Sequence, residues 1–216
     1  MNLNLHEKKV YSQNGEDGLI EYIFDKIGIK YYYCVEFGVE SGAECNTRYF
    51  IEKYKSDFLH MDSSFESDII KKELITSENI ESLFAKYNVP KYFDLLSIDI
   101  DFNDYYVWKA IENYYPTVVI IEYNAHIPPD ESKVVKYGPY RTWDGTDYFG
   151  ASLLALKNLG DKKGYRLIAC DNNGVNAFFV CRDYYYFFEE KGITDIYKSA
   201  GYEKYRISNE SMIILE

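Results

Sequence analysis

Short apolar runs alternate with segments of helical periodicity from about residue 33 to residue 170. The clearest runs, 93–98 (FDLLSI) and 117–123 (TVVIIEY), are apolar and flanked by polar residues. This pattern is typical of strands that are buried on both faces. The same criterion predicts further strands at 32–37, 57–61, 72–75, 165–170 and 177–181.

Helices are expected between these strands. Ser77 is placed to cap a helix whose apolar residues share one face, and Pro116 is placed to stop another. The expected helices cover 19–27, a segment that starts near Glu44, the segment after Ser77, 104–114 and 150–163.

Strands that alternate with helices predict a parallel sheet with helices on both faces. Between the last two strands, residues 171–174 (DNNG) form a favourable hairpin turn, which predicts an antiparallel strand at one edge. The chain contains no internal repeat, low-complexity segment or linker. We therefore expect residues 1–216 to form a single α/β domain.

One long stretch, 124–148, has no strand or helix pattern and contains prolines, glycines and aromatic residues. Loops of this length inside compact domains are usually functional or disordered. Its aromatic residues favour a folded segment, so we expect a lid-like insertion. The tail from residue 183 should form a helix with a final strand or cap at 212–215.

Composition narrows the class of protein. Asp and Glu number 35 against 24 Lys and Arg, a net charge of −11, which argues against a nucleic-acid partner. Hydrophobic residues make up 47% of the chain, too many for global disorder. The four cysteines form no CxxC pair, so we expect buried thiols rather than a zinc site or a disulfide framework.

The first residues are polar, and no run approaches the ~18 apolar residues of a membrane span. The sequence therefore predicts a cytoplasmic protein with no membrane span. The tyrosine-rich tail is a candidate surface for a homodimer, although aromatic residues more commonly pack in a protein's own core.

A glycine turn follows the strand at 32–37, from Glu36 through Gly38 to Gly42. Glycines let the backbone approach a ligand closely, where a Cβ atom would collide. The turn lacks the third glycine of the G-x-G-x-x-G fingerprint of dinucleotide-binding folds. A strand–helix turn with no ligand is the alternative interpretation.

Asp62 ends the next strand. A carboxylate there accepts hydrogen bonds from a ribose diol, or caps the following turn, and both interpretations can hold at once. A dense polar cluster at 11–18 (YSQNGEDG) precedes the helix expected at 19–27, as a binding segment or as a helix cap.

Carboxylates gather where two further strands end. Asp99, Asp101 and Asp104 follow one buried strand, and Glu122 ends the next. Adjacent parallel strands end at the same edge, where open α/β sheets bind ligands. Like charges this close need a metal ion, a shared proton or a cationic ligand, with solvated turn residues as the alternative. His126 lies just beyond, as a proton acceptor or a surface histidine.

Together these residues resemble the FkbM-type branch of S-adenosylmethionine-dependent methyltransferases. The matching pieces are 12–17 (SQNGED), 36–42 (EFGVESG) with Asn46 and Thr47, 97–101 (SIDID) followed by 103–105 (NDY), and 121–124 (IEYN). The resemblance runs from about residue 11 to residue 181 and lies in the order and spacing of the motifs. It implies a Rossmann-like class I methyltransferase fold with S-adenosylmethionine as cofactor.

The resemblance also implies roles for single residues. The glycine turn lines the methionine part of the cofactor, Asp62 holds the ribose, and Thr76 lies near the adenine. The implied cofactor-binding residues are Ser12, Gln13, Glu16, Glu36, Gly38, Gly42, Asp62, Ser63, Thr76 and Asp99.

Such enzymes typically methylate sugar hydroxyls, which implies a sugar or nucleotide-sugar substrate and a role in surface polysaccharide or glycan biosynthesis. A sugar hydroxyl is a poor nucleophile, so a base or a metal-bound alkoxide is needed. We expect Asp101, Glu122 and His126 to supply this chemistry, and Asp99, Asp101 and Glu122 to hold Mg²⁺ or Mn²⁺. Arg141 is a candidate partner for a phosphate of a nucleotide-activated sugar.

Three other classes of protein remain open. An NAD-type Rossmann protein would carry the missing third glycine. A non-catalytic α/β interaction module would have no use for polar clusters at several strand ends. A metal-dependent hydrolase would need more histidine or aspartate ligands near His126.

Overall fold

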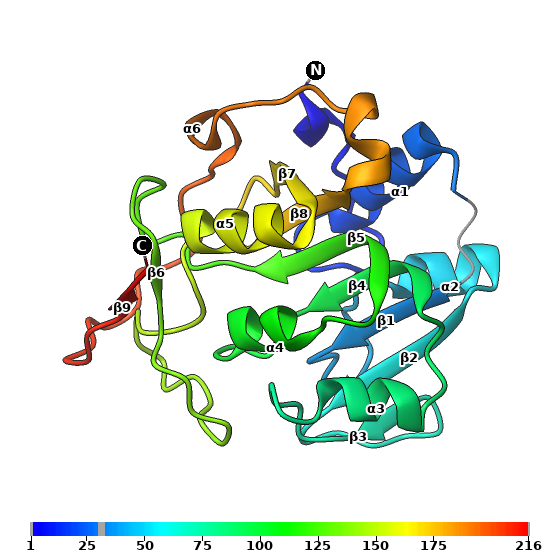
Figure 1. Ribbon diagram of the computed structural model, residues 1–216, viewed down its shortest axis with the longest axis horizontal. Helices are drawn as coiled ribbons and strands as arrows, with labels where there is room; N and C mark the ends of the chain where they lie inside the picture. Colours follow the sequence, from blue (N-terminus) through cyan, green and yellow to red (C-terminus); the bar gives the residue numbers. More distant parts are fainter. Residues whose placement is uncertain (1, 30–32, 216) are drawn as a thin grey trace.

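Seven strands form one central sheet in the computed structural model, which describes residues 2–29 and 33–215. The order is β3-β2-β1-β4-β5-β8-β7; β1 to β5 are parallel, and β8 runs antiparallel to both β5 and β7. The strands are β1 (Tyr33–Phe37), β2 (Asp57–Asp62), β3 (Ile70–Lys72), β4 (Tyr92–Ile98), β5 (Tyr115–Glu122), β7 (Tyr165–Cys170) and β8 (Asn176–Cys181). The predicted α/β fold, with a mostly parallel sheet and an antiparallel edge hairpin, is confirmed (Figure 1).

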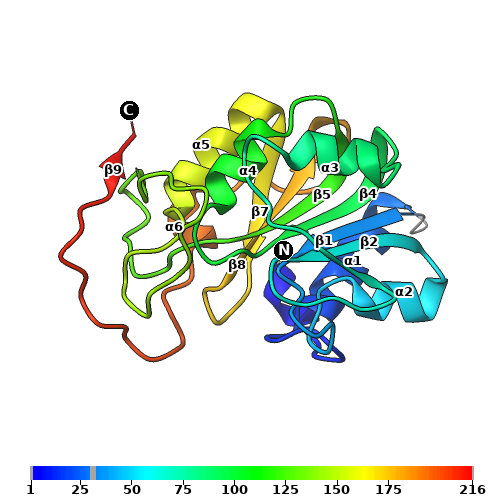
Figure 2. The same ribbon diagram turned by 90° about the horizontal axis from the view of Figure 1, so that it is seen from below.

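Helices cover both faces of the sheet (Figure 2). Successive residues of a strand point to opposite faces, and both Leu95 and Leu96 of β4 are buried. The Leu95 face packs against α1 (Glu16–Ile27) and α2 (Arg48–Tyr54), and the Leu96 face against α3 (Ile80–Lys86), α4 (Asp104–Ala110) and α5 (Leu153–Lys163). Within the described ranges, no helix is long and apolar enough to cross a membrane.

Two helix predictions are wrong in detail. Helix α4 ends at Ala110 rather than 114, because the backbone amides of Glu112 and Asn113 donate to the Glu81 carboxylate and hold a turn there. Pro116 therefore lies inside β5 and does not stop the helix. Ser77 does not cap α3 either, since Asn79 occupies its N-cap position.

Other predicted boundaries are shifted by a few residues. Strand β3 covers Ile70–Lys72 instead of 72–75, because these are the residues that pair with 60–62 of β2; Ile75 is buried but lies beyond the strand. Helix α1 begins three residues before the prediction, and α5 begins after Ser152, whose side chain accepts from the amide of Ala155. Tyr32, where the first strand was expected to start, lies outside the described residues.

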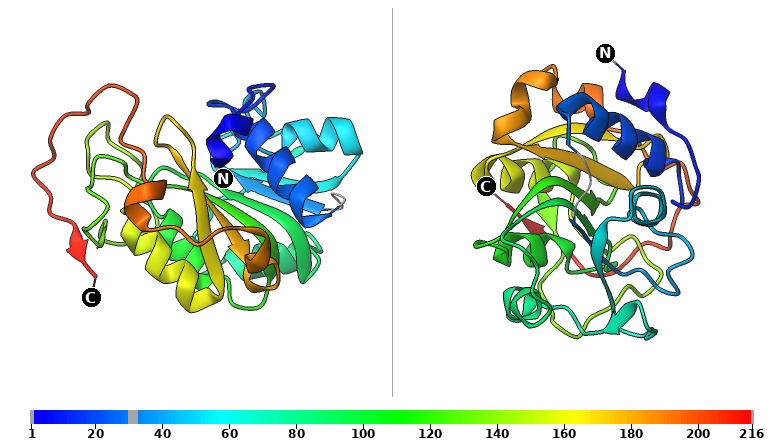
Figure 3. Two further views of the ribbon diagram at one scale, coloured as in Figure 1. Left: turned by 90° about the horizontal axis from the view of Figure 1, so that it is seen from above. Right: turned by 90° about the vertical axis from the view of Figure 1, so that its right-hand side faces the viewer.

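The 124–148 insertion and the C-terminal tail lie side by side (Figure 3). Strand β6 (Lys133–Val134) pairs antiparallel with β9 (Ile213–Ile214), so the final strand is confirmed. The helix expected after residue 183 is replaced by a 3₁₀ helix, Arg182–Phe187, and the short α6 (Ile193–Ile196). The tail thus returns to the edge of the sheet where the parallel strands end.

Candidate active site

A cavity of about 840 Å³ opens at the edge of the sheet where the parallel strands end. The loops after β1, β2, β4 and β5 line it, together with the β7–β8 hairpin, part of the 124–148 insertion and the C-terminal tail. In open α/β sheets this edge is where ligands bind. Nine Asp and Glu side chains in the described part of the chain line the cavity, against one cation, Arg141.

Most residues predicted for the site line this cavity. They are Gln13, Glu16, Glu36, Gly38, Asp62, Ser63, Asp99, Asp101, Glu122 and Arg141. Ser12, Gly42, Thr76 and His126 do not. The amide of Thr76 donates to Asn79 at the start of α3, and Gly42 packs beside Ile70. The structure gathers the strand-end residues, and their roles as ligands stay predictions.

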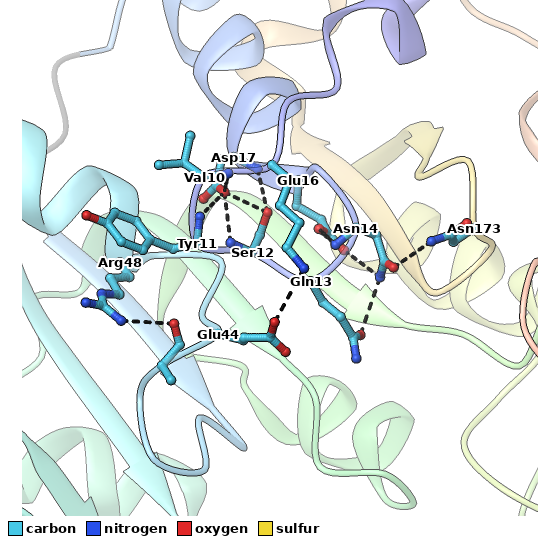
Figure 4. A network of polar contacts seen from close by, with 12 residues as sticks. Val10, Tyr11, Ser12, Gln13, Asn14, Glu16, Asp17, Glu44, Arg48 and Asn173 are labelled. Atoms are coloured by element: carbon cyan, nitrogen blue, oxygen red, sulfur yellow. Dashed lines mark hydrogen bonds and ion pairs between the residues drawn. The ribbon is translucent and has the colours of Figure 1, made fainter.

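Ser12 is held in the turn before α1 by Asp17 (Figure 4). One oxygen of the buried Asp17 carboxylate, Oδ2, accepts from the amides of Val10, Tyr11 and Ser12 and from the Ser12 hydroxyl, at 2.7–2.8 Å. These bonds satisfy backbone donors that a buried turn would otherwise leave without partners. Ser12 and Asp17 therefore shape the loop that carries Gln13 to the cavity.

The same loop joins two sides of the cavity. On one side, Arg48 of α2 stacks on the Tyr11 ring, with 4.3 Å between the guanidinium carbon and the ring centroid. On the other, the Asn14 side chain accepts from Asn173 of the β7–β8 hairpin at 2.6 Å. Residues 11–14 therefore connect α2 with the β7–β8 hairpin across the carboxyl ends of the parallel strands (Figure 4).

Gly38 is required by a close backbone contact. Its φ is +71°, and a Cβ atom at this position would lie 1.5 Å from the carbonyl oxygen of Asp99. The turn after β1 thus packs directly on the end of β4. This contact fixes the distance between the glycine turn and the carboxylates at the end of β4.

Replacing Gly38 with alanine should lower the free energy of unfolding by about 3 kcal/mol or more, since left-handed strain and a backbone clash add together. Gly28 is a matched control, because its φ is +74° and a Cβ atom there would meet no neighbouring segment within 4 Å. The control should lose only about 1–2 kcal/mol. Urea unfolding followed by circular dichroism measures both, and equal losses would show that the Asp99 contact is unimportant.

Glu36 is buried at the end of β1 and binds the start of α2. Its carboxylate accepts from the amides of Asn46 and Thr47 at 2.8 and 2.9 Å and from the Thr47 hydroxyl at 2.6 Å. This explains why α2 begins at Arg48 rather than near Glu44. The Thr47 hydroxyl also contacts His60 of β2, and burial lowers the pKa of His60 to about 4, so this histidine is neutral. Glu36 is thus a support of the cavity wall.

Asp62 caps the turn after β2, as one interpretation of the sequence predicted. Its Oδ1 accepts from the amides of Ser64 and Phe65 at 2.7 and 3.0 Å, and its Oδ2 accepts from the amide of Glu40 at 2.8 Å. The Glu40 bond ties Asp62 to the glycine turn. Because each carboxylate oxygen can accept more than one hydrogen bond, Asp62 can still receive a diol from the cavity.

Three carboxylates meet at the ends of β4 and β5. Oxygen atoms of Asp99, Asp101 and Glu122 lie within 4.8 Å of one another, and no ion pair involves them among the residues described. Burial raises the pKa of all three, and repulsion from neighbouring carboxylates raises it further. The set offers the oxygen ligands that Mg²⁺ and Mn²⁺ prefer.

Asp104 lies at the start of α4 and not among the carboxylates that line the cavity. It is fully buried at the start of α4, where its Oδ1 accepts from the amide of Ile100 at 2.8 Å, and burial raises its pKa to about 7. Asp101, in contrast, has a φ of +64°, which turns its side chain out of the loop into the cavity. The three carboxylates that meet in the cavity are thus Asp99, Asp101 and Glu122, the set named from the sequence as a candidate metal site, and Asp104 is not part of it.

An aromatic wall, which we define as Trp143, Tyr202 and Tyr205, lines the cavity from the insertion and the tail. The Trp143 and Tyr205 ring centroids are 4.7 Å apart. Burial raises the pKa of both tyrosines, and the charge of Glu122 raises it further, so the wall lies close to the carboxylates. His126 packs edge-on against Tyr202 and Tyr205, behind the wall. The two tyrosines were missed because no local motif connects them with the site.

Arg141 lines the cavity but already has an anionic partner. Its two terminal nitrogens donate to both carboxylate oxygens of Glu210 in the tail, at 2.8 and 2.6 Å. Its guanidinium also lies over the rings of Phe102 and Tyr148. A phosphate at Arg141 therefore competes with Glu210 for these two nitrogens.

No protein-family model matches the chain, and no curated protein matches it. Among solved structures, it is similar to a proposed sarcosine dimethylglycine methyltransferase from Galdieria sulphuraria, at 12% identity over 70% of this chain and 60% of that one, with a TM-score of 0.38. It is also similar to the MycE methyltransferase of the mycinamycin biosynthetic pathway, in complex with Mg, SAH and mycinamycin VI, at 16% identity over 74% of this chain and 47% of that one, with a TM-score of 0.43.

A third similar structure is a SAM-dependent methyltransferase from Aquifex aeolicus, at 10% identity over 74% of this chain and 89% of that one, with a TM-score of 0.33. The chain spans 60% and 47% of the length of the first two structures. Because all three TM-scores are below 0.5, function has to be inferred from the cavity and residues of this chain.

Proposed function

We propose that the chain is an S-adenosylmethionine-dependent methyltransferase that methylates a hydroxyl group of a sugar or a nucleotide-activated sugar. The supporting observation is that one cavity combines two sets of residues. Asp62 and the glycine turn line one part of it, and Asp99, Asp101 and Glu122 line another. An adenosyl cofactor and a hydroxyl acceptor need these two kinds of surface next to each other.

The cavity has the properties that the cofactor requires. Its volume of about 840 Å³ is ample for a nucleoside ligand together with a small acceptor. Val39, Leu74 and Ile75 supply an apolar lining for an adenine ring, and Asp62 offers acceptor oxygens for a ribose diol. The antiparallel β7–β8 hairpin also differs from the all-parallel dinucleotide-binding sheet, which weakens the NAD-type alternative.

Bound S-adenosylmethionine supplies an electrophilic methyl group on its sulfonium. The chain has to hold the acceptor oxygen in line with that group, and orientation contributes about 7–11 kcal/mol in such reactions. In this proposal Asp101 accepts the hydroxyl proton, and its raised pKa makes its carboxylate a stronger base. His126 reaches the cavity only through Tyr202 and Tyr205, so we assign the proton to Asp101.

A divalent cation would be held by Asp99, Asp101 and Glu122. Its charge would stabilise the deprotonated hydroxyl, whose proton would then pass to solvent water instead of to Asp101. The carboxylate oxygens suit Mg²⁺ or Mn²⁺, and titration of the protein with either ion tests this part of the proposal.

Cofactor binding is tested by thermal unfolding with S-adenosylhomocysteine or NAD. At 100 times its dissociation constant, a ligand adds ~2.7 kcal/mol to stability, which is a shift of about 5–10 °C for a chain of this size. We expect that shift with S-adenosylhomocysteine and none with NAD. No shift with S-adenosylhomocysteine, or a similar shift with NAD, would contradict the proposed cofactor.

A further inference from the structure

The side chains that line the cavity offer many hydrogen-bond acceptors and few hydrogen-bond donors. Several of its carboxylates already accept hydrogen bonds within the chain: Glu36 from the start of α2, Asp62 from three amides, and Glu73 from Lys86 and Tyr87. The only cation that lines it in the described ranges, Arg141, is held by Glu210. An anionic acceptor would therefore meet repulsion here, whereas a cationic one would not.

Two buried acceptor atoms in the cavity have no donor. Glu122 and Asn176 are directly opposite each other on β5 and β8, so their side chains are neighbours on the same face. Oε2 of Glu122 and Oδ1 of Asn176 are both shielded from solvent and have no hydrogen-bond partner among the residues described. Asn176 is only 4% exposed, and its amide nitrogen already donates to Glu16.

Buried polar atoms are rarely left unsatisfied, so these two acceptors need a donor, which a ligand in the cavity can supply. An ammonium group fits two adjacent acceptors, since it offers three donors and a positive charge. The aromatic wall adds a second feature of cation recognition. Ring faces of tryptophan and tyrosine attract cations, and they also present flat apolar surfaces to the C–H groups of a sugar ring.

We propose that the acceptor is an amino sugar, whose protonated amine donates to Glu122 and Asn176 while its ring packs against the aromatic wall. The inference rests on the proposed function and narrows its acceptor. Asp101, which lies beside Glu122, remains free to take a proton from a neighbouring hydroxyl of the same sugar. A nucleotide-linked sugar is disfavoured, because its diphosphate would add negative charge to an acidic cavity.

Calorimetric titration of the protein saturated with S-adenosylhomocysteine tests the proposal, in EDTA at neutral pH. The probes are glucosamine, N-acetylglucosamine and glucose, which share one ring and differ in the charge and substituent at one carbon. We expect glucosamine to bind at least about tenfold more tightly than either neutral sugar. Equal affinities, or no binding of glucosamine, would overturn the proposal.

Two variants connect the preference with the named residues. Asn176→Leu removes one acceptor, and Trp143→Leu removes a ring of the wall, so each should lower the affinity for glucosamine about three- to tenfold. Tyr140→Leu is the matched control, because Tyr140 lies in the same insertion, is 83% exposed and does not line the cavity. The same loss in all three variants would contradict the assigned site.

The test separates this inference from the proposed function. If S-adenosylhomocysteine binds and the three sugars bind with equal affinity, only the amino-sugar inference is wrong. The partner of Glu122 is then the amine of the cofactor or a metal ion. Sugar binding that requires Mg²⁺ would favour the ion. If S-adenosylhomocysteine does not bind, the proposed function falls, and titration of the unliganded protein with glucosamine still decides whether a cation site exists.

Discussion

Replacing Asp101 with asparagine should lower the turnover number by about a thousandfold and leave binding of S-adenosylhomocysteine within about twofold. The variant removes the proposed proton acceptor, or one metal ligand, from the carboxylate set at the ends of β4 and β5. Asparagine tolerates the left-handed backbone that Asp101 adopts, with φ at +64°, so the loop should keep its shape. Transfer of labelled methyl groups from S-adenosylmethionine to the acceptor measures turnover.

Glu40→Gln is the matched control for this variant. Glu40 also lines the cavity with a left-handed φ, of +46°, and the substitution removes the same charge. If loss of negative charge alone slows the reaction, both variants should be impaired. An Asp101→Asn variant with wild-type turnover would remove Asp101 from the mechanism, and one that fails to bind S-adenosylhomocysteine would place Asp101 in the cofactor site.

The sheet could be predicted from the sequence because its strands are short, apolar and buried on both faces. Residues 93–98 and 117–123 are mostly apolar and lack the regular polar face of a helix at the surface, and they became β4 and β5. The ends of helices were less predictable, since contacts from distant segments decide them. The Glu81 carboxylate accepts from the turn that follows α4, and the Glu36 carboxylate accepts from the amides just before α2.

The sequence predicted those site residues whose positions follow from the carboxyl ends of the parallel strands. Asp62, Asp99 and Glu122 line the cavity because each ends a parallel strand at the same edge. Side-chain direction within a loop follows from hydrogen bonds that sequence spacing does not reveal. For that reason Asp104 points to the backbone of Ile100, and Ser12 points to Asp17.

The aromatic wall could not be predicted from local sequence patterns. Tyr202 and Tyr205 lie more than fifty residues after the insertion that they face, in a tail that the sequence predicted to form a helix with a final strand or cap. Their position depends on β6–β9 pairing and on the bond from the amide of Asp147 to the carbonyl of Arg206. Only the folded chain shows that the tail contributes to the lining of the cavity.

Replacing Asp62 with asparagine should raise the dissociation constant of S-adenosylhomocysteine about a hundredfold. Two ribose hydroxyls would then donate to a neutral side chain, and hydrogen bonds to a charged group contribute roughly 1.5–3 kcal/mol each. Asparagine keeps one acceptor for the turn after β2, whereas alanine would leave the amides of Glu40, Ser64 and Phe65 without their partner. Calorimetric titration measures the affinity, and the melting temperature of the unliganded protein reports the fold.

Asp57→Asn controls for the loss of one negative charge, because Asp57 is exposed at the opposite end of the same strand and should leave affinity unchanged. A cofactor analogue without the ribose hydroxyls makes the test specific. It should bind the wild-type chain about a hundredfold more weakly than S-adenosylhomocysteine, yet bind Asp62→Asn nearly as well as S-adenosylhomocysteine does. If instead the variant and the analogue weaken binding independently, Asp62 acts only through the turn that it caps, and the ribose lies elsewhere in the cavity.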